Sequence, residues 1–341
     1  MKNQTCLKVV LCCSLVVLTM LSAQVQGQPP QSRGRGAYGD WLVKIDYEGR
    51  QFDSIISFSR DKEGKRTAHW ISIMGVTELK DVSYEDGKLS FAMERRNREG
   101  QISTTKFAGK IEKGKLTGTL SSDRGEYKAE GGRMPRMPRA VGSWQMKFKV
   151  GDRDITTTLI VKADKDSKLV AEWQSPWGEH TISDVQYERG NLSFKRKSTF
   201  QDRQWESTFA GTIDRETDVL SGVINVPEMG EIQAEGTRTG GALIGDWDIE
   251  TTSDRGTRKQ RLRINPDMSG LYGAIPIKKV HFEENRVDFL LVLQFGDQTY
   301  EMTFDGKLED AKLTGEMTSS WGSQKVKGTK IVRTFRRRSS Q

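Results

Sequence analysis

The sequence contains three copies of one pattern, and this repeat constrains the fold more than any other feature of the 341-residue chain. Residues 81–91 (DVSYEDGKLSF) recur at 184–194 (DVQYERGNLSF) with eight of eleven positions identical, and residues 279–289 form a more divergent third copy. The first two copies are 103 residues apart. This interval is the size of a domain, whereas solenoid repeats span roughly 20–50 residues. The sequence therefore predicts three self-contained modules in tandem.

Three short motifs recur around this segment in the same order. A Gly-x-Trp opens each copy, a Phe-x-Gly follows the central segment, and a Leu-x-Gly comes next. Their first residues are Gly39, Gly142 and Gly245; Phe107, Phe209 and Phe304; and Leu116, Leu220 and Leu313. The constant order indicates that the three modules share one topology.

The N-terminus is typical of an export signal. Lys2 and Lys8 precede an apolar run over residues 9–21, and small residues follow up to Gly27. The apolar run is shorter than the roughly 20 residues that span a membrane. We therefore expect a cleaved signal peptide at residues 1–27, no membrane span after cleavage, and an exported protein that is periplasmic or extracellular. An uncleaved anchor is the alternative.

All three cysteines lie in this segment, so the chain after cleavage would have no thiol for a disulfide or a thiolate metal site. The formal charge is +8, and the loss of Lys2 and Lys8 leaves +6. A mildly basic exported protein fits an anionic glycan, a lipid or an envelope protein as partner. Export argues against nucleic acid.

The middle copy shows the strand pattern most clearly. Apolar residues alternate with polar ones from Trp144 to Val150, and a β-branched run follows at residues 154–163. The same reading gives eight short strands in about 97 residues, joined by Gly-, Asp- and Asn-rich turns. Short hairpins predict up-and-down antiparallel connections, and eight such strands close most naturally into a barrel. An eight-stranded sandwich is the alternative. The fold class is therefore all-β.

These patterns divide the chain into consecutive segments. After the signal peptide we expect a flexible leader at 28–36 and β modules separated by a Pro/Arg linker and a Gly linker, with a basic tail at the end. The third module is shortened before Phe289, where residues 271–277 replace a strand. The boundaries are 37–133 for module 1, 134–140 for the first linker, 141–238 for module 2, 239–243 for the second linker, 244–335 for module 3 and 336–341 for the tail.

A Gly-x-Trp on the first strand with a basic residue on the last resembles the calycin group, the lipocalins and avidins. In that group the tryptophan plugs one end of an eight-stranded barrel and the basic side chain packs over its ring. The resemblance implies the pairs Trp41 with Arg133, Trp144 with Arg238, and Trp247 with Lys330 or Arg333. The modules are short, and they lack the lipocalin Thr-Asp-Tyr motif, a disulfide and a terminal helix. The repeat also resembles tandem modules of uncharacterised exported bacterial proteins, some attached to hydrolases, which implies no activity.

Catalytic and cofactor motifs are missing from the sequence. It has no Gly-x-Ser-x-Gly, P-loop, dinucleotide fingerprint or His-Glu-x-x-His. Each of its three histidines, His69, His180 and His281, is confined to one copy and is expected on the surface or in a turn. Asp81 recurs as Asp184 but gives way to a lysine in the third copy, which favours a structural role. We expect no enzyme activity, no cofactor and no metal site.

Tryptophans are the remaining candidates for recognition, because aromatic side chains at a rim can stack on sugar rings or apolar ligands. Core packing is the favoured interpretation for the two that match at the 103-residue offset, and binding or simple exposure for those in turns. The candidate ligand-binding residues are Trp70, Trp173, Trp177, Trp205 and Trp321.

Three functions remain open. The favoured one is a non-enzymatic binding or scaffold protein of the cell envelope, in which repeated weak modules gain avidity. The second is a carrier of a small apolar ligand inside the barrels, although interiors this small can be filled by side chains. A hydrolase-type enzyme or an accessory domain array is the least favoured.

Overall fold

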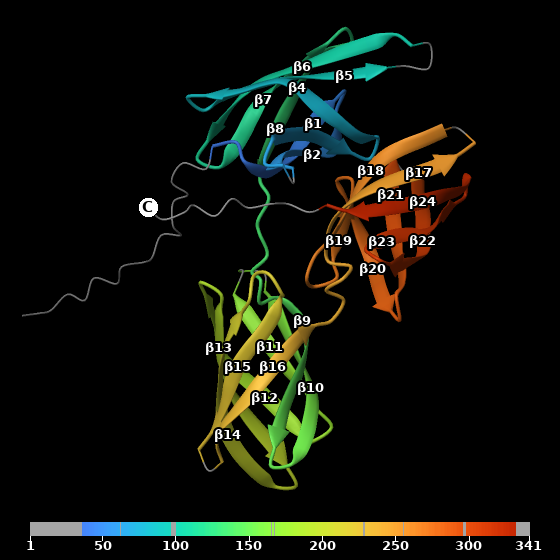
Figure 1. The fold of residues 1–341 in the computed structure, drawn as a ribbon. Helices are drawn as coiled ribbons and strands as arrows, with labels where there is room; N and C mark the ends of the chain where they lie inside the picture. The colour runs from blue at the N-terminus through green and yellow to red at the C-terminus, as the bar shows by residue number, and fades with distance from the viewer. Residues whose placement is uncertain are drawn as a thin grey trace, which may run out of the picture. The chain divides into compact units, whose positions relative to one another are not determined.

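The computed structural model describes residues 36–61, 63–96, 100–164, 166, 168–227, 229–254, 256–295 and 298–331. These residues form 24 strands joined by turns and loops, in three successive groups of eight (Figure 1). The described part contains no helix, and so none that could cross a lipid bilayer. The predicted signal peptide, the leader up to residue 35 and the basic tail lie outside the described residues.

Module 1 contains the first eight strands, coloured blue to green in Figure 1. They are β1 (Gly39–Tyr47), β2 (Arg50–Arg60), β3 (Arg66–Ser72), β4 (Gly75–Glu85), β5 (Lys88–Arg96), β6 (Ile102–Glu112), β7 (Lys115–Ser122) and β8 (Gly125–Arg133). Each strand pairs antiparallel with the next, and β8 pairs with β1 to close the barrel.

Module 2 contains the second eight strands, green to yellow in Figure 1. They are β9 (Gly142–Val150), β10 (Arg153–Ala163), β11 (Leu169–Gln174), β12 (Glu179–Glu188), β13 (Asn191–Phe200), β14 (Arg203–Ile213), β15 (Val219–Val226) and β16 (Gly230–Arg238). Their order is the same, but β11 and β12 are not hydrogen-bonded to each other, so this barrel is open along one seam.

Module 3 contains the last eight strands, orange to red in Figure 1. They are β17 (Gly245–Ser253), β18 (Gly256–Ile264), β19 (Gly270–Tyr272), β20 (Ile275–Glu283), β21 (Arg286–Phe295), β22 (Gln298–Glu309), β23 (Lys312–Ser319) and β24 (Gly322–Lys330). This barrel is closed, and the predicted shortening appears as the three-residue β19. The prediction of three eight-stranded antiparallel barrels is confirmed, with one nearly closed, and the sandwich alternative does not apply.

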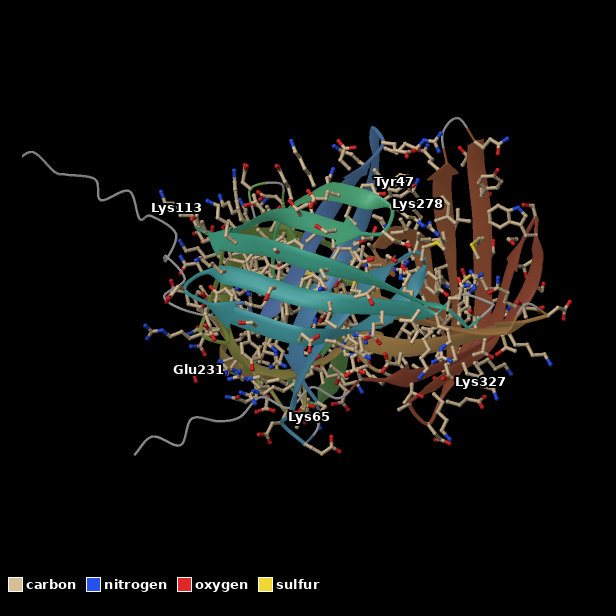
Figure 2. All side chains as sticks on the ribbon, turned by 90° about the horizontal axis from the view of Figure 1, so that it is seen from above. Tyr47, Lys65, Lys113, Glu231, Lys278 and Lys327 are labelled. Carbon is tan, nitrogen blue, oxygen red and sulfur yellow. The ribbon has the colours of Figure 1, made fainter. Side chains whose placement is uncertain are left out.

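Alternation along the strands places one set of side chains in each core. On β9, for example, Trp144 and Met146 are fully buried while Gln145 and Lys147 are exposed. Charged side chains project outward from the strands and turns, as the labelled Lys327 on β24 and Lys113 in the β6–β7 turn show in Figure 2. Burial of one face and solvation of the other is the arrangement that period-2 patterning favours.

The recurring Phe-x-Gly and Leu-x-Gly motifs form one unit in each core. In module 1 Gly109 on β6 lies opposite Gly118 on β7, and the ring of Phe107 covers both. A Cβ built on either glycine would lie 2.5 Å from the ring's Cζ. Modules 2 and 3 repeat this arrangement with Phe209 and Phe304. Glycine is therefore required because the aromatic ring occupies the space above the strand pair, the packing known as aromatic rescue.

The recurring aspartate marks a β-bulge. Pairing of β12 with β13 shifts between Ser183 and Gln186, and β4 shifts at the equivalent point. Asp81 and Asp184 lie inside these bulges with φ of 52° and 55°. Aspartate tolerates the left-handed region better than most residues. The structure therefore assigns this conserved feature of the repeat to backbone geometry.

Modules 1 and 3 contact each other. Arg263 on β18 forms salt bridges with Asp246 of its own module, at 2.7 Å, and with Asp40 of module 1, at 2.5 Å. All three side chains are less than one-fifth exposed. Burial opposes the charged guanidinium, but the two carboxylates outweigh it and raise the pKa of Arg263.

An apolar patch lies beside this ion triad. Ile55 and Ile71, on the outer surface of module 1, form one buried cluster with Ala274 of module 3. The Gln260 side chain of module 3 also donates hydrogen bonds to the carbonyl oxygens of Ser72 and Ile73. The shortened β19 and its turn thus supply part of the surface that meets module 1.

The second linker is a series of hydrogen-bonded turns. The amides of Leu243 and Ile244 both donate to the carbonyl oxygen of Gly240, and Leu243 is fully buried. Burial of Leu243 in the core of module 3 fixes the end of a segment that its glycines would otherwise leave flexible.

Candidate ligand-binding sites

One end of each barrel is closed by a tryptophan and a basic side chain. Each indole N–H donates a hydrogen bond of 2.8–2.9 Å to the carbonyl oxygen four residues earlier. The charged group lies over the ring, at 4.5 Å in module 1, 4.0 Å in module 2 and 5.6 Å in module 3, within cation–π range. The pairs are Trp41 with Arg133, Trp144 with Arg238 and Trp247 with Lys330, and the three tryptophans are fully buried. Arg333 lies outside the described residues.

The opening glycine makes room for the basic side chain. Gly39, Gly142 and Gly245 have φ between 113° and 133°, a region that disfavours other residues. A Cβ on Gly39 would lie 2.6 Å from the Arg133 guanidinium, and one on Gly142 equally close to that of Arg238. Gly-x-Trp and the distant arginine therefore form a single structural unit.

Backbone carbonyl oxygens and one carboxylate accept hydrogen bonds from these cations. Arg238 donates to the carbonyl oxygens of Val141 and Arg139 and forms a 2.5 Å salt bridge with Asp218. Burial lowers the pKa of Lys330, which donates to Ala242 at 2.7 Å. These contacts stabilise a sealed end, so a ligand would approach through the opposite end or the wall.

The antiparallel order places the other candidate tryptophans toward the opposite, open ends. Trp177 lies in the turn between β11 and β12 and is 43% exposed, and Trp321 lies in the turn between β23 and β24 and is 55% exposed. Trp205 is half-buried near the start of β14. Trp70 and Trp173 are buried in the cores of modules 1 and 2. The structure therefore separates the five candidates into two core residues and three near the rims.

The open end of module 3 forms the first candidate site. A cavity of about 440 Å³ is bounded by Trp321, Tyr272 and Met302 of this module and by the turn at Met74 of module 1. The ring of Tyr300 lies 4.5 Å from that of Trp321, tilted by 37°. Burial raises the pKa of the Tyr272 phenol, which stays protonated at neutral pH. The site therefore has an exposed tryptophan, packed against a half-buried tyrosine, beside a recess.

Polar groups surround this recess. Arg258 and Lys259 line it from β18, Gln324 from β24 and Asp254 from the β17–β18 turn. Side-chain amides, hydroxyls and cations around an aromatic pair can both stack on a cyclic ligand and hydrogen-bond to it.

The interior of module 2 forms the second candidate site, and it is polar. Arg196 on β13 is only 9% exposed, its Nε donates a 3.1 Å hydrogen bond to the hydroxyl of Ser207, and its guanidinium lies 4.5 Å from the Trp173 ring centroid. Burial lowers the pKa of Arg196 to about 10. Within the described residues no carboxylate lies within salt-bridge distance of this arginine.

A histidine lies next to this arginine. The ring nitrogens of His180 contact the hydroxyls of Ser175, at 2.7 Å, and Ser198, at 2.9 Å. Burial and the Arg196 charge lower its pKa, so the imidazole is neutral at pH 7. His180 thus lies on a strand and is half-buried, rather than in a turn or on the open surface.

Sequence reasoning missed this polar group, although a signal was available. Offsets between copies place Arg196 where modules 1 and 3 have Met93 and Leu291, both buried apolar residues. A comparison of inward-facing positions among the copies would have shown one charged exception.

The described residues contain no group of three His, Cys, Asp or Glu side chains able to hold an ion.

Fold and sites together define a class of protein: a tandem array of eight-stranded antiparallel barrels, each sealed at one end by a tryptophan and a cation. The architecture fits calycin-like modules at this level. No protein-family model matches the chain, and no curated protein matches its sequence.

Two of the solved structures that are similar to this chain have low TM-scores. A candidate outer membrane protein of Bacteroides fragilis NCTC 9343 is 10% identical over 59% of this chain and 97% of that chain, with a TM-score of 0.21. A mutant of the vaccine antigen transferrin-binding protein B from Haemophilus parasuis Hp5 is 8% identical over 87% of this chain and 76% of that chain, with a TM-score of 0.19. At these scores no property of either protein carries over to this chain.

Proposed function

We propose that this chain is an exported, non-enzymatic binding protein of the cell envelope. It binds a glycan at the open end of module 3 and prefers an anionic one. Export rests on the signal-like N-terminus. The observation that carries the binding site is the exposed ring of Trp321, packed against the half-buried ring of Tyr300, beside a recess with a polar rim.

Recognition would combine stacking with charge. A sugar ring lies against an aromatic face while its hydroxyls bond to side chains such as Gln324, and a uronate carboxylate pairs with Arg258 or Lys259. The formal charge of +6 that remains without Lys2 and Lys8 would favour encounter with an anionic polymer. An envelope protein or a lipid surface is the competing partner for the same rim.

The test is a calorimetric titration of the purified chain with a four-residue alginate oligosaccharide and with maltotetraose. We expect the uronate oligomer to bind more tightly, because only it offers carboxylates. Trp321→Ala should abolish binding without unfolding the protein, since this side chain is 55% exposed. Trp177→Ala, which removes another exposed tryptophan from module 2, is the matched control. Equal binding by the wild type and Trp321→Ala contradicts the proposal.

The second candidate function is a carrier of a small ligand inside a barrel. The open seam between β11 and β12 favours it for module 2 alone. In each module a phenylalanine ring already fills the centre above the paired glycines. Native mass spectrometry of the protein purified from its host's envelope separates the two functions, because only a carrier would retain a stoichiometric small adduct.

A further inference from the structure

The core of module 2 differs from its sister cores in charge. Where Arg196 faces inward, module 1 has Met93 at 5% exposure and module 3 has Leu291 at 0%. The fold therefore does not need a cation at this position, because two barrels of the same topology form without one. The arginine at a position that the other cores fill with methionine or leucine therefore needs an explanation other than folding.

The described residues around Arg196 disfavour the charged form of its guanidinium. Its charge is removed from water, and desolvation alone lowers its pKa. Its contacts are a neutral hydroxyl, Ser207, and the face of Trp173. Buried arginines are ordinarily paired with carboxylates, and here the guanidinium retains donors for an oxyanion.

A second polar group in the same core lacks a partner. Thr157 on β10 points inward at 5% exposure, and its hydroxyl has no hydrogen-bond partner among the described residues. Two residues further along β10, Leu159 pairs with Trp173, the residue that lies under Arg196. A donor and a cation thus face the interior of the only barrel that is open along a seam among the three described.

We propose that module 2 binds a small organic anion inside the barrel, with its oxyanion head on the guanidinium of Arg196 and its apolar body against Trp173 and Phe148. The geometry fits because the guanidinium offers a planar fork that matches a carboxylate. The rings of Trp173 and Phe148 lie 6.2 Å apart and belong to the same apolar cluster.

A surface cavity lies beside Phe148. Pairing of β9 with β16 ends at Phe148 and Ala234, and beyond it a cavity of about 580 Å³ opens between the two strands. Phe148, Val150 and Ile232 line this cavity together with two lysines and two carboxylates, Asp154 and Glu231. Phe148 thus lines this cavity while its ring lies 6.2 Å from that of Trp173, which the guanidinium of Arg196 covers, so a ligand would enter the barrel by displacing Phe148.

The experiment is calorimetric titration of the full-length chain with octanoate, 1-octanol and octylammonium, which share a chain and differ in head group. Octanoate should bind with a stoichiometry of one, and the other two should bind at least about tenfold more weakly, since a hydrogen bond to a charged group contributes that much. Acetate and inorganic phosphate, which lack the apolar chain, are titrated in the same way. If they bind as tightly as octanoate, the site takes a free oxyanion and the apolar body contributes nothing.

Arg196→Met installs the residue of module 1 and gives two expected results. Octanoate binding should be lost, and the melting temperature of module 2 should rise by about 4 °C or more, because an uncompensated buried charge is replaced by an apolar side chain. Lys197→Met changes the neighbouring outward-facing residue and should affect neither. A second variant, Thr157→Val, keeps the cation and should weaken octanoate binding severalfold.

Three results overturn the proposal. They are equal affinity for octanoate and 1-octanol, unchanged octanoate binding in Arg196→Met, and absence of binding by octanoate, acetate and phosphate alike. A lower melting temperature in Arg196→Met with wild-type behaviour toward all ligands assigns Arg196 to core packing. The Trp321→Ala variant should still bind octanoate, so failure at module 3 and failure at module 2 are distinguishable.

Discussion

Gly118→Ala tests why the Leu-x-Gly motif recurs in all three modules. The new Cβ would lie 2.5 Å from Cζ of Phe107, 2.6 Å from the carbonyl oxygen of Ala108 and 2.7 Å from Cα of Gly109. Carbon atoms attract at about 3.5–4.0 Å, so the overlap is about 1 Å. Two of the three atoms belong to the backbone of a closed barrel, which limits relaxation.

The magnitude follows from two opposing effects. Overpacking of a core costs about 1–3 kcal/mol, and a backbone clash belongs at the upper end. Alanine also restricts the unfolded chain, which returns about 0.4–1 kcal/mol. The free energy of unfolding of module 1 should therefore fall by about 2 kcal/mol. For a module of this size the melting temperature would drop by about 8–16 °C.

Gly132→Ala is the matched control in the neighbouring strand. Its Cβ would meet nothing closer than 3.9 Å, and modules 2 and 3 carry Thr237 and Thr329 at the equivalent position. We expect a rise of a few degrees from the smaller entropy of the unfolded chain. Differential scanning calorimetry of the purified chain measures both variants. Equal melting temperatures for the two would refute the packing argument.

A double variant isolates the aromatic ring. Combining Gly118→Ala with Phe107→Leu removes the contact with Cζ but leaves the carbonyl of Ala108 in place. The cost of Gly118→Ala should therefore shrink in the Phe107→Leu background without vanishing. A cost that stays the same in both backgrounds would show that the ring does not enforce the glycine.

Two further predictions concern charge. Arg263→Met should destabilise the contact of modules 1 and 3 by about 3–5 kcal/mol, because it removes the cation that Asp40 and Asp246 share. Arg286→Met is the control, and its loss should stay below about 1 kcal/mol because its ion pair is exposed. Calorimetry measures both variants. The lowered pKa of His180 means that the neutral imidazole stabilises module 2 above the unfolded pKa of about 6.5, and that this stability is lost as the pH falls through the folded pKa. Melting temperatures at pH 7.5 and 5.5 should therefore differ less in His180→Thr than in the wild type, and equal differences would contradict the assignment.

Much of the fold could be read from the repeat. Alternation predicted the strands, and short turns between eight of them predicted up-and-down barrels, because local hairpins leave few other ways to protect sheet edges. The same motifs contain the sealed end: Gly142 and Trp144 on the first strand and Arg238 on the last form one packed unit. Phe209 and its paired glycines form another.

The candidate sites were predicted only in part. Trp321 was a candidate because it lies in a turn, but its partner Tyr300 and the recess beside it come from strands brought together by the barrel. Arg196 resembles any other residue in a basic strand, since its neighbours Lys195 and Lys197 carry the same charge. It is distinguished by its inward-facing position, which the other two copies fill with Met93 and Leu291.

The sequence by itself determined the number of modules and their all-β topology, because these follow from local periodicity and from motifs that recur in the same order. The residues that seal each barrel were implied by the resemblance to the calycin group. Tertiary structure alone decided three other features: the open seam of module 2, the burial of Arg196 without an acid, and the salt bridge of Arg263 with Asp40 across 223 positions. The physical reason is that hydrogen-bonding partners, desolvation and contacts between distant residues depend on which groups come together in space, and no local pattern encodes that.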